Sequence, residues 1–282
     1  MTRPAALLVT GRVIGLVASF AIGIVLARLF APAAFGTYKQ FFLVYGTLYG
    51  LAQLGMAESL YYFVPRNPAR TGRYAFNALV TLALAGGGSL VLLHAWRTQI
   101  AVRLMNAGLA DYMVLIGLFL TFMLMSTVLE IVMVSRKQHL LAAITYACSD
   151  IVRTLFFIAP AILLGSLRAV FIGATAFAAL RLVLLLAALW REYGRDFRVD
   201  VTLYTTTYLA SVPIFMIWSL TILPSIFAVN AVLRVFAQTR FLLIMNLIRL
   251  AMVAALSPTV EVPPRISSVC PALRSRPVVS DP

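Results

Sequence analysis

Residues 174–190 read ATAFAALRLVLLLAALW, an apolar run of helix length that carries one charge, Arg181, near its middle. At about 1.5 Å per residue, roughly 20 such residues cross the ~30 Å hydrocarbon layer of a bilayer. An arginine at the centre of a membrane helix costs about 2.5–3.5 kcal/mol on insertion, so it usually faces a bundle interior or an aqueous cavity. The stretch therefore predicts a membrane helix with Arg181 on its protein-facing side.

The composition of the whole chain points the same way. Of its 282 residues, 62% are hydrophobic and only 11% are charged, and the mean hydropathy is +0.97, far above that of a soluble domain. The chain has 23 Lys and Arg against 9 Asp and Glu, but the basic residues are scattered between apolar runs. This scatter argues against nucleic-acid binding and fits loops held against anionic lipid. Cys148 and Cys270 lie too far apart in sequence to suggest a disulfide framework or a metal site.

The apolar runs predict an all-α, polytopic membrane bundle. Residues 1–195 form a predicted N-terminal lobe of six spans joined by short connectors. Residues 196–256 form a partial second lobe with two apolar runs, near 209–232 and 240–256. The tail at 257–282 is rich in Pro, Ser and Arg, and we expect it to be disordered. The six spans are expected near residues 7–29, 41–64, 76–95, 112–134, 141–164 and 169–190.

The basic residues of the connectors favour a cytoplasmic N-terminus. In this orientation more Lys and Arg lie on the cytoplasmic side than on the outer side, as the positive-inside rule prefers. The apolar N-terminal run continues past Arg12, so we expect an uncleaved first span. The cytoplasmic set is Arg3, Arg66, Arg70, Arg73, Arg136, Lys137, Arg191, Arg195 and Arg198, and the outer set is Lys39, Arg97, Arg103 and Arg168.

Residues 26–66, LARLFAPAAFGTYKQFFLVYGTLYGLAQLGMAESLYYFVPR, carry several short motifs in a characteristic order. A first span ends in Leu-Ala-Arg-Leu, a Pro-containing turn and Phe-Gly-x-Tyr follow, and the second span closes with Leu-Gly and then Pro-Arg. This stretch resembles the opening of bacterial oligosaccharide flippases of the multidrug/oligosaccharidyl-lipid/polysaccharide exporter superfamily. Residues 207–256 resemble later spans of the same superfamily, the tenth and eleventh, so three intervening spans are missing from this chain.

The resemblance implies a flippase-type transporter in the bacterial inner membrane. Its substrate would be a polyprenyl-pyrophosphate-linked oligosaccharide used in surface polysaccharide biosynthesis, such as that of lipopolysaccharide. Members of the superfamily usually carry twelve or more spans in two six-helix lobes, with the substrate path between them. The shortened second lobe leaves an alternative open, an internally deleted fragment that transports nothing, unless a homodimer supplies the second lobe.

Four intramembrane charges are the candidate substrate-binding residues: Arg181, Arg12, Glu58 and Glu130. A guanidinium suits a phosphate or pyrophosphate, so Arg181, with Arg12 as its partner, would hold the anionic head of the lipid-linked sugar. The alternative is structural, with Arg181 paired to Glu58 or Glu130. We identify no catalytic residues, cofactor or metal site. A membrane-embedded glycosyl- or acyltransferase is the remaining alternative, but it would need clustered Asp, Glu or His at one membrane face.

Three further features predict packing or anchoring rather than binding. Asp150 and Arg153, three residues apart on one helix, would form a local ion pair. The run at 86–88 consists of three glycines, which favour close approach of another helix. Tyr38 and Lys39 are of the type that anchors the start of a helix at the membrane interface.

Overall fold

The structure, a computed structural model, describes residues 2–53, 55–136, 139–194 and 198–205, and every element in these ranges is helical. They all belong to one compact unit of the chain, residues 1–223. The later runs at 209–232 and 240–256 and the tail at 257–282 lie outside the described residues. The elements are α1 (Thr2–Leu29), α2 (Pro32–Ala52), α3 (Met56–Arg66), the 3-10 turn η1 (Pro68–Arg70), α4 (Thr71–Ala95), α5 (Arg97–Arg103), the 3-10 turn η2 (Ala107–Tyr112), α6 (Met113–Ser135), α7 (His139–Leu164) and α8 (Leu167–Tyr193).

Four helices of the described chain are long and apolar enough to cross a membrane. They indicate a helical membrane protein, as the composition predicts. These helices contain the third to sixth predicted spans, and their candidate spans are Pro68–Ala95, Ala107–Ser135, Ile144–Leu164 and Leu167–Tyr193. For the first predicted span, the apolar part among the described residues is the shorter Val17–Leu29.

The second predicted span is not one continuous helix. Helix α2 ends at Ala52 and α3 begins at Met56, so the expected helix over 41–64 is broken near its middle. Gly55 adopts a left-handed backbone conformation with φ of 65°, which L-residues with a side chain rarely take. The residues around the break are largely apolar, so hydropathy alone does not reveal it.

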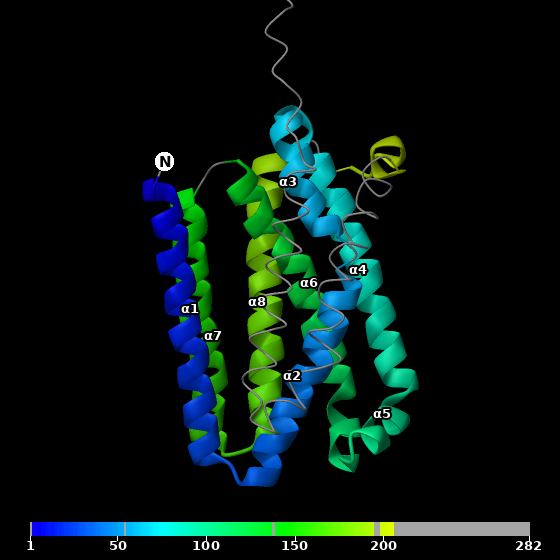
Figure 1. Ribbon diagram of the computed structural model, residues 1–282. Coiled ribbons are helices and arrows are strands. Elements are labelled where there is room, and N and C mark those ends of the chain that lie inside the picture. Colours follow the sequence, from blue (N-terminus) through cyan, green and yellow to red (C-terminus); the bar gives the residue numbers. More distant parts are fainter. Residues whose placement is uncertain (1, 54, 137–138, 195–197, 206–282) are drawn as a thin grey trace, which may run out of the picture. The chain divides into compact units, whose positions relative to one another are not determined.

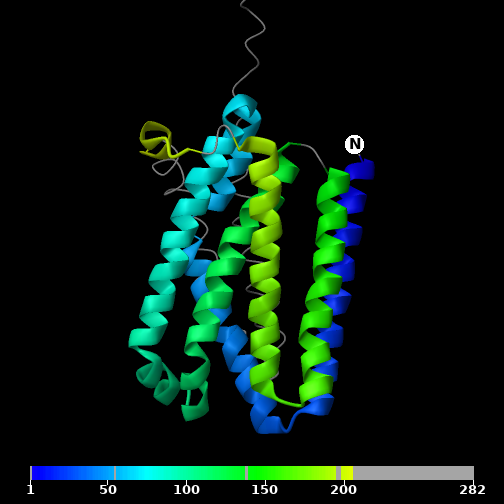
Figure 2. The same cartoon turned by 180° about the vertical axis from the view of Figure 1, so that it is seen from behind.

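Helix α6 is the central helix of the described bundle. It packs along α4 and α8, and it also contacts α2, α3 and α7. Helices α1 and α7 form a second closely packed pair and lie side by side in both views (Figures 1 and 2). Helix α8 contacts both α6 and α7, and so joins the pair of α4 and α6 to the pair of α1 and α7.

Two apolar cores hold these helices together. One gathers α3 and the first half of α4 with the second halves of α6 and α8. The other gathers the end of α1 and the start of α2 with the beginnings of α6 and α8, and here the rings of Phe41 and Phe171 stack with centroids 4.0 Å apart. Because lipid chains are themselves apolar, close packing rather than the hydrophobic effect holds helices together inside a membrane.

Helices α4 and α6 pack closely, and glycines of both helices face the neighbouring backbone. A Cβ at Gly86 would lie 2.8 Å from the Cα of Thr121, and one at Gly117 would lie 2.9 Å from the Cα of Leu90. Gly87 and Gly88 have nothing within 4 Å of that position. Of the three consecutive glycines, Gly86 is therefore the one that the helix contact requires.

The chain after α8 returns to the beginning of α4. Asp200 pairs with Arg73 at 3.3 Å, and its backbone carbonyl accepts a hydrogen bond from the Asn77 side chain at 3.2 Å. The Asp200 carboxylate also accepts a hydrogen bond from the Leu203 backbone N–H at 3.1 Å, which caps the helical residues 201–205. That backbone hydrogen bond and the nearby Arg73 hold the pKa of Asp200 below its ordinary value.

Candidate functional site

Arg181 of α8 and Glu130 of α6 form an ion pair inside the bundle. The Nη2 atom of Arg181 contacts Oε1 of Glu130, and the two side chains are 21% and 17% exposed. Both helices belong to the candidate membrane spans. The pair therefore neutralises two charges that would each be costly to leave alone in hydrocarbon. The sequence leaves two possible carboxylate partners for Arg181, which are Glu58 and Glu130. In the structure the partner is Glu130.

A cavity of about 320 Å³ lies beside this ion pair, between α6, α7 and α8. Its volume is at the lower end of the range for ligand sites, roughly 300–1,000 Å³. Most of the cavity wall is apolar, and a few polar side chains also line it. The polar and ionic lining residues are Ser126 and Glu130 from α6, Thr145, Cys148 and Ser149 from α7, and Arg181 from α8.

Two tyrosines of α2 lie within electrostatic reach of Arg181. Tyr45 and Tyr49 are one helical turn apart, and the charge of Arg181 acts on both hydroxyl groups. The Tyr49 hydroxyl also shares a hydrogen bond of 2.9 Å with Oγ1 of Thr127 on α6. Sequence analysis missed these tyrosines, although their spacing of four residues, which places both on one face of a helix, is a signal that could have identified them.

Glu58 lies at the break between α2 and α3, away from any described arginine partner. Its Oε1 accepts a hydrogen bond from Gln53 Nε2 at 2.5 Å, across the gap that Gly55 allows. The other side-chain oxygens, Oε2 of Glu58 and Oε1 of Gln53, are buried and have no hydrogen-bond partner within the described chain. Buried unpaired polar atoms are uncommon, and broken membrane helices are where transporters commonly bind ligands and ions.

Arg12 belongs to α1, and its side chain lies outside the part of the chain whose side chains are described. Its helix packs along α7. The predicted partnership of Arg12 with Arg181 therefore stays a prediction. The structure brings together two of the four candidates, Arg181 and Glu130, and gives Glu58 a different neighbour.

The second predicted ion pair holds α1 against α7. Asp150 and Arg153 are 3.0 Å apart on α7, as their spacing predicts. Arg153 also donates a hydrogen bond of 2.7 Å to Oγ of Ser19 on α1. Gly15 leaves the room that the Asp150 carboxylate occupies, because a Cβ at this position would overlap it. This cluster explains why α1 stays with α7 rather than with its sequence neighbour α2.

The described part of the chain therefore defines a helical membrane protein with a charged cavity among its helices. The chain matches no protein-family model, no curated protein and no solved structure. The similarity to oligosaccharide flippases thus rests on the motifs quoted from the sequence and stays a prediction. Within the described residues, no three His, Cys, Asp or Glu side chains gather as a metal site would require.

Proposed function

We propose that this chain is a flippase-type transporter for a lipid-linked oligosaccharide in surface polysaccharide biosynthesis. It would lie in the bacterial inner membrane as a multi-pass protein with a cytoplasmic N-terminus. A second lobe, from the residues beyond 205 or from a second copy of the chain, would complete the substrate path. The resemblance of residues 26–66 supplies the substrate class, and the geometry of the Arg181 site supports a role in holding an anion.

The observation that carries the proposal is the ion pair beside a cavity. A purely structural contact between two membrane helices needs no charge, since small or apolar residues pack them well. Here Arg181 and Glu130 both line a space of ligand size, and Tyr45 and Tyr49 add hydroxyl groups within electrostatic reach of the guanidinium. A buried charge pair also contributes little net stability compared with apolar side chains of similar volume. Stability alone therefore does not account for the pair, whereas a role in binding does.

The proposed mechanism is an exchange of partners at Arg181. Glu130 holds the guanidinium while no substrate is bound, which keeps the charge tolerable in the membrane. The pyrophosphate of the substrate then takes the place of the carboxylate, because a guanidinium forms paired, charge-assisted hydrogen bonds with phosphate oxygens. The tyrosine hydroxyls offer further donors to the same oxygens.

One second candidate has an observation in its favour. Arg181 already forms an ion pair with Glu130, which is what a structural pair in a non-transporting fragment would show. A membrane-embedded glycosyl- or acyltransferase is less favoured, because each intramembrane acid of the described chain is engaged by its own neighbour. Glu130 contacts Arg181, Asp150 contacts Arg153, and Glu58 contacts Gln53.

The transport role can be separated from the structural role by measuring export and protein abundance together. In a strain with a polysaccharide export defect that the wild-type chain restores, Arg181→Gln alone should lower abundance, because it strands the buried Glu130 carboxylate. The double variant Arg181→Gln with Glu130→Gln should return to wild-type abundance but should not restore export. Arg181→Lys should restore export only in part, since lysine keeps the charge but loses the planar fork.

The matched control is the second ion pair, neutralised as Asp150→Asn with Arg153→Gln. It measures the effect of removing an intramembrane pair that does not line the α6, α7 and α8 cavity. If the neutral Arg181 and Glu130 double variant exports as well as wild type at equal abundance, the pair is structural and the proposed role of Arg181 is wrong.

A further inference from the structure

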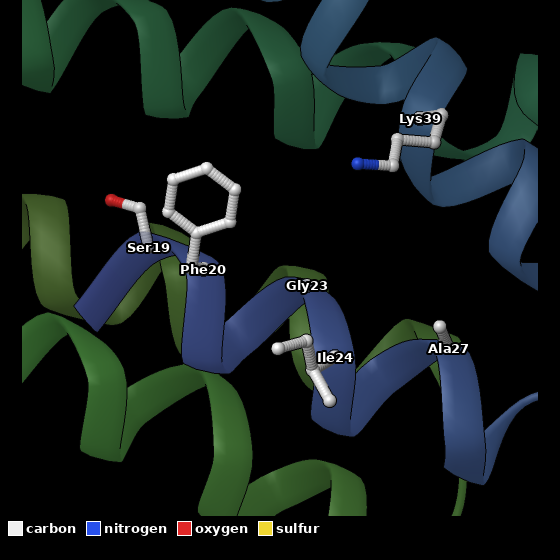
Figure 3. A pocket seen from close by; sticks show the side chains of 6 residues that line it. All are labelled: Ser19, Phe20, Gly23, Ile24, Ala27 and Lys39. Carbon is white, nitrogen blue, oxygen red and sulfur yellow. The ribbon is translucent and has the colours of Figure 1, made fainter. Parts of the chain in front are cut away.

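A second open space lies between α1 and α2, and it shares no lining residue with the Arg181 cavity. The two helices meet near their connection, and the groove between them has a volume of about 450 Å³. Five lining residues come from α1 and one from α2 (Figure 3). They are Ser19, Phe20, Gly23, Ile24 and Ala27 on α1, and Lys39 on α2.

Lys39 brings a charge into this groove. Figure 3 shows its amino group directed away from α2 into the space beside α1. The ammonium lies 5.1 Å from the ring centre of Phe35 and 5.9 Å from that of Tyr38, which hold it by cation–π contact. None of the described acidic side chains pairs with it. These contacts are compatible with the predicted role of Lys39 as an anchor at the start of the helix, and they leave its charge open to a ligand in the groove.

The net charge of the groove comes from Lys39. Arg153 reaches the groove through its hydrogen bond to Ser19, but its own charge is balanced by Asp150 at 3.0 Å. Lys39 is exposed near the start of α2, so its ammonium, which no described carboxylate neutralises, can attract an anionic phosphate at the membrane surface. The site thus favours an anionic ligand over a neutral or cationic one.

The rest of the groove is suited to a hydrocarbon chain. Phe20, Ile24 and Ala27 follow each other at helical spacing along α1, and Phe20 and Ile24 are 65% and 55% exposed. A peptide lying here would bring backbone N–H and C=O groups that need partners inside the membrane, whereas a lipid chain brings none. The combination of an apolar strip and one cation matches a lipid with an anionic head group.

We propose that the groove between α1 and α2 binds an anionic phospholipid of the bilayer. Its phosphate contacts the Lys39 ammonium, and one acyl chain lies along Phe20, Ile24 and Ala27. The bound lipid fills the space between two helices that hold few contacts to each other, and so links the α1 and α7 pair to the rest of the bundle. This proposal does not depend on the transport function or on Arg181.

The test uses the full chain in nanodiscs that contain phosphatidylglycerol and phosphatidylcholine, followed by native mass spectrometry of the lipids that stay bound. The wild-type chain should retain phosphatidylglycerol in preference to phosphatidylcholine. Lys39→Gln should weaken that retention about tenfold, the effect expected for the loss of one charge-assisted contact, and Lys39→Arg should preserve it. Arg97→Gln removes an exposed cation elsewhere and should have no effect.

A second pair of variants tests the groove rather than the charge. A Cβ at Gly23 would have nothing within 4 Å, so Gly23→Leu should fold and fill the groove, and it should displace the lipid although Lys39 is intact. Gly46 on α2 is equally open and does not line the groove, so Gly46→Leu is the matched control. Equal retention of the two lipids by the wild-type chain, or wild-type retention by Lys39→Gln or Gly23→Leu, would overturn the proposal.

Discussion

Five charges along the described helices are each held by a neighbouring side chain. Arg181 and Glu130 pair between helices, Asp150 and Arg153 pair within one, and Glu58 accepts a hydrogen bond from Gln53. The sequence predicts that such charges face protein or a cavity, because the cost of exposing them to lipid is known. It could not predict which carboxylate meets Arg181. That choice depends on how the helices are rotated against each other, which their spacing in sequence does not define.

Asp200 allows a prediction about pH. Its pKa is lowered in the folded chain, chiefly by the hydrogen bond from the Leu203 N–H, so the carboxylate stabilises the contact of residues 198–205 with α4. For an acid with a lowered pKa, this contribution is complete above the ordinary value of about 3.8 and is lost as the pH falls through the lowered pKa. Hydrogen exchange of residues 201–205 should therefore show less protection, relative to the intrinsic rate, at strongly acidic pH than at pH 6.

The control for this prediction is charge removal at neutral pH. Asp200→Asn should reduce the protection of residues 201–205 at pH 6 and should remove most of its acid dependence. Asp111→Asn, which changes an exposed carboxylate in η2, should leave both unchanged. Protection of 201–205 that is the same in Asp200→Asn and wild type would show that the carboxylate does not hold this segment.

At the scale of helices, hydropathy and length predicted most of the bounds. The ends of α4, α6, α7 and α8 lie within a few residues of the ends of the predicted spans, because a helix must be apolar over the thickness of the bilayer. The start of α4 is the exception, since the helix begins before the predicted span. The break between α2 and α3 was not predicted. Its signal is a single glycine, Gly55, in a run whose hydropathy continues without a gap, and only the backbone conformation reveals it.

The contact between α4 and α6 supports a prediction with a built-in control. Gly86→Leu should force α4 away from α6, because the new side chain would meet the backbone of Thr121, and overpacking of this kind costs about 1–3 kcal/mol. Gly88→Leu, on the same helix but in open space, should cost much less. Thermal unfolding of the purified chain in one detergent measures both. Equal midpoints for the two variants would contradict the close packing described for Gly86.

At the scale of the molecule, the all-helical architecture followed from the sequence, whereas the internal spaces did not. The Arg181 cavity lies between α6, α7 and α8 and the Lys39 groove between the consecutive helices α1 and α2, and hydropathy along the sequence indicates neither space. For Lys39, the position near a turn predicts an interface anchor, which stays a prediction, whereas only the structure shows the side chain directed toward α1. The predicted second lobe lies beyond the described residues, so the proposed transporter depends on residues 206–256 or on a second copy of the chain.

The proposed exchange of partners at Arg181 is tested most directly by binding of a short prenyl pyrophosphate, farnesyl pyrophosphate, to the purified chain. If Glu130 competes with the ligand, Glu130→Gln should tighten binding, by about tenfold for a competing contact of ~1.4 kcal/mol. Because the Lys39 groove is itself proposed to bind an anionic lipid, every chain compared in this test carries Lys39→Gln. In that background, Arg181→Gln with Glu130→Gln should abolish binding. Affinity that does not rise in Glu130→Gln, or that survives in the neutral double variant, would contradict the assignment of Arg181 as the anion-binding residue.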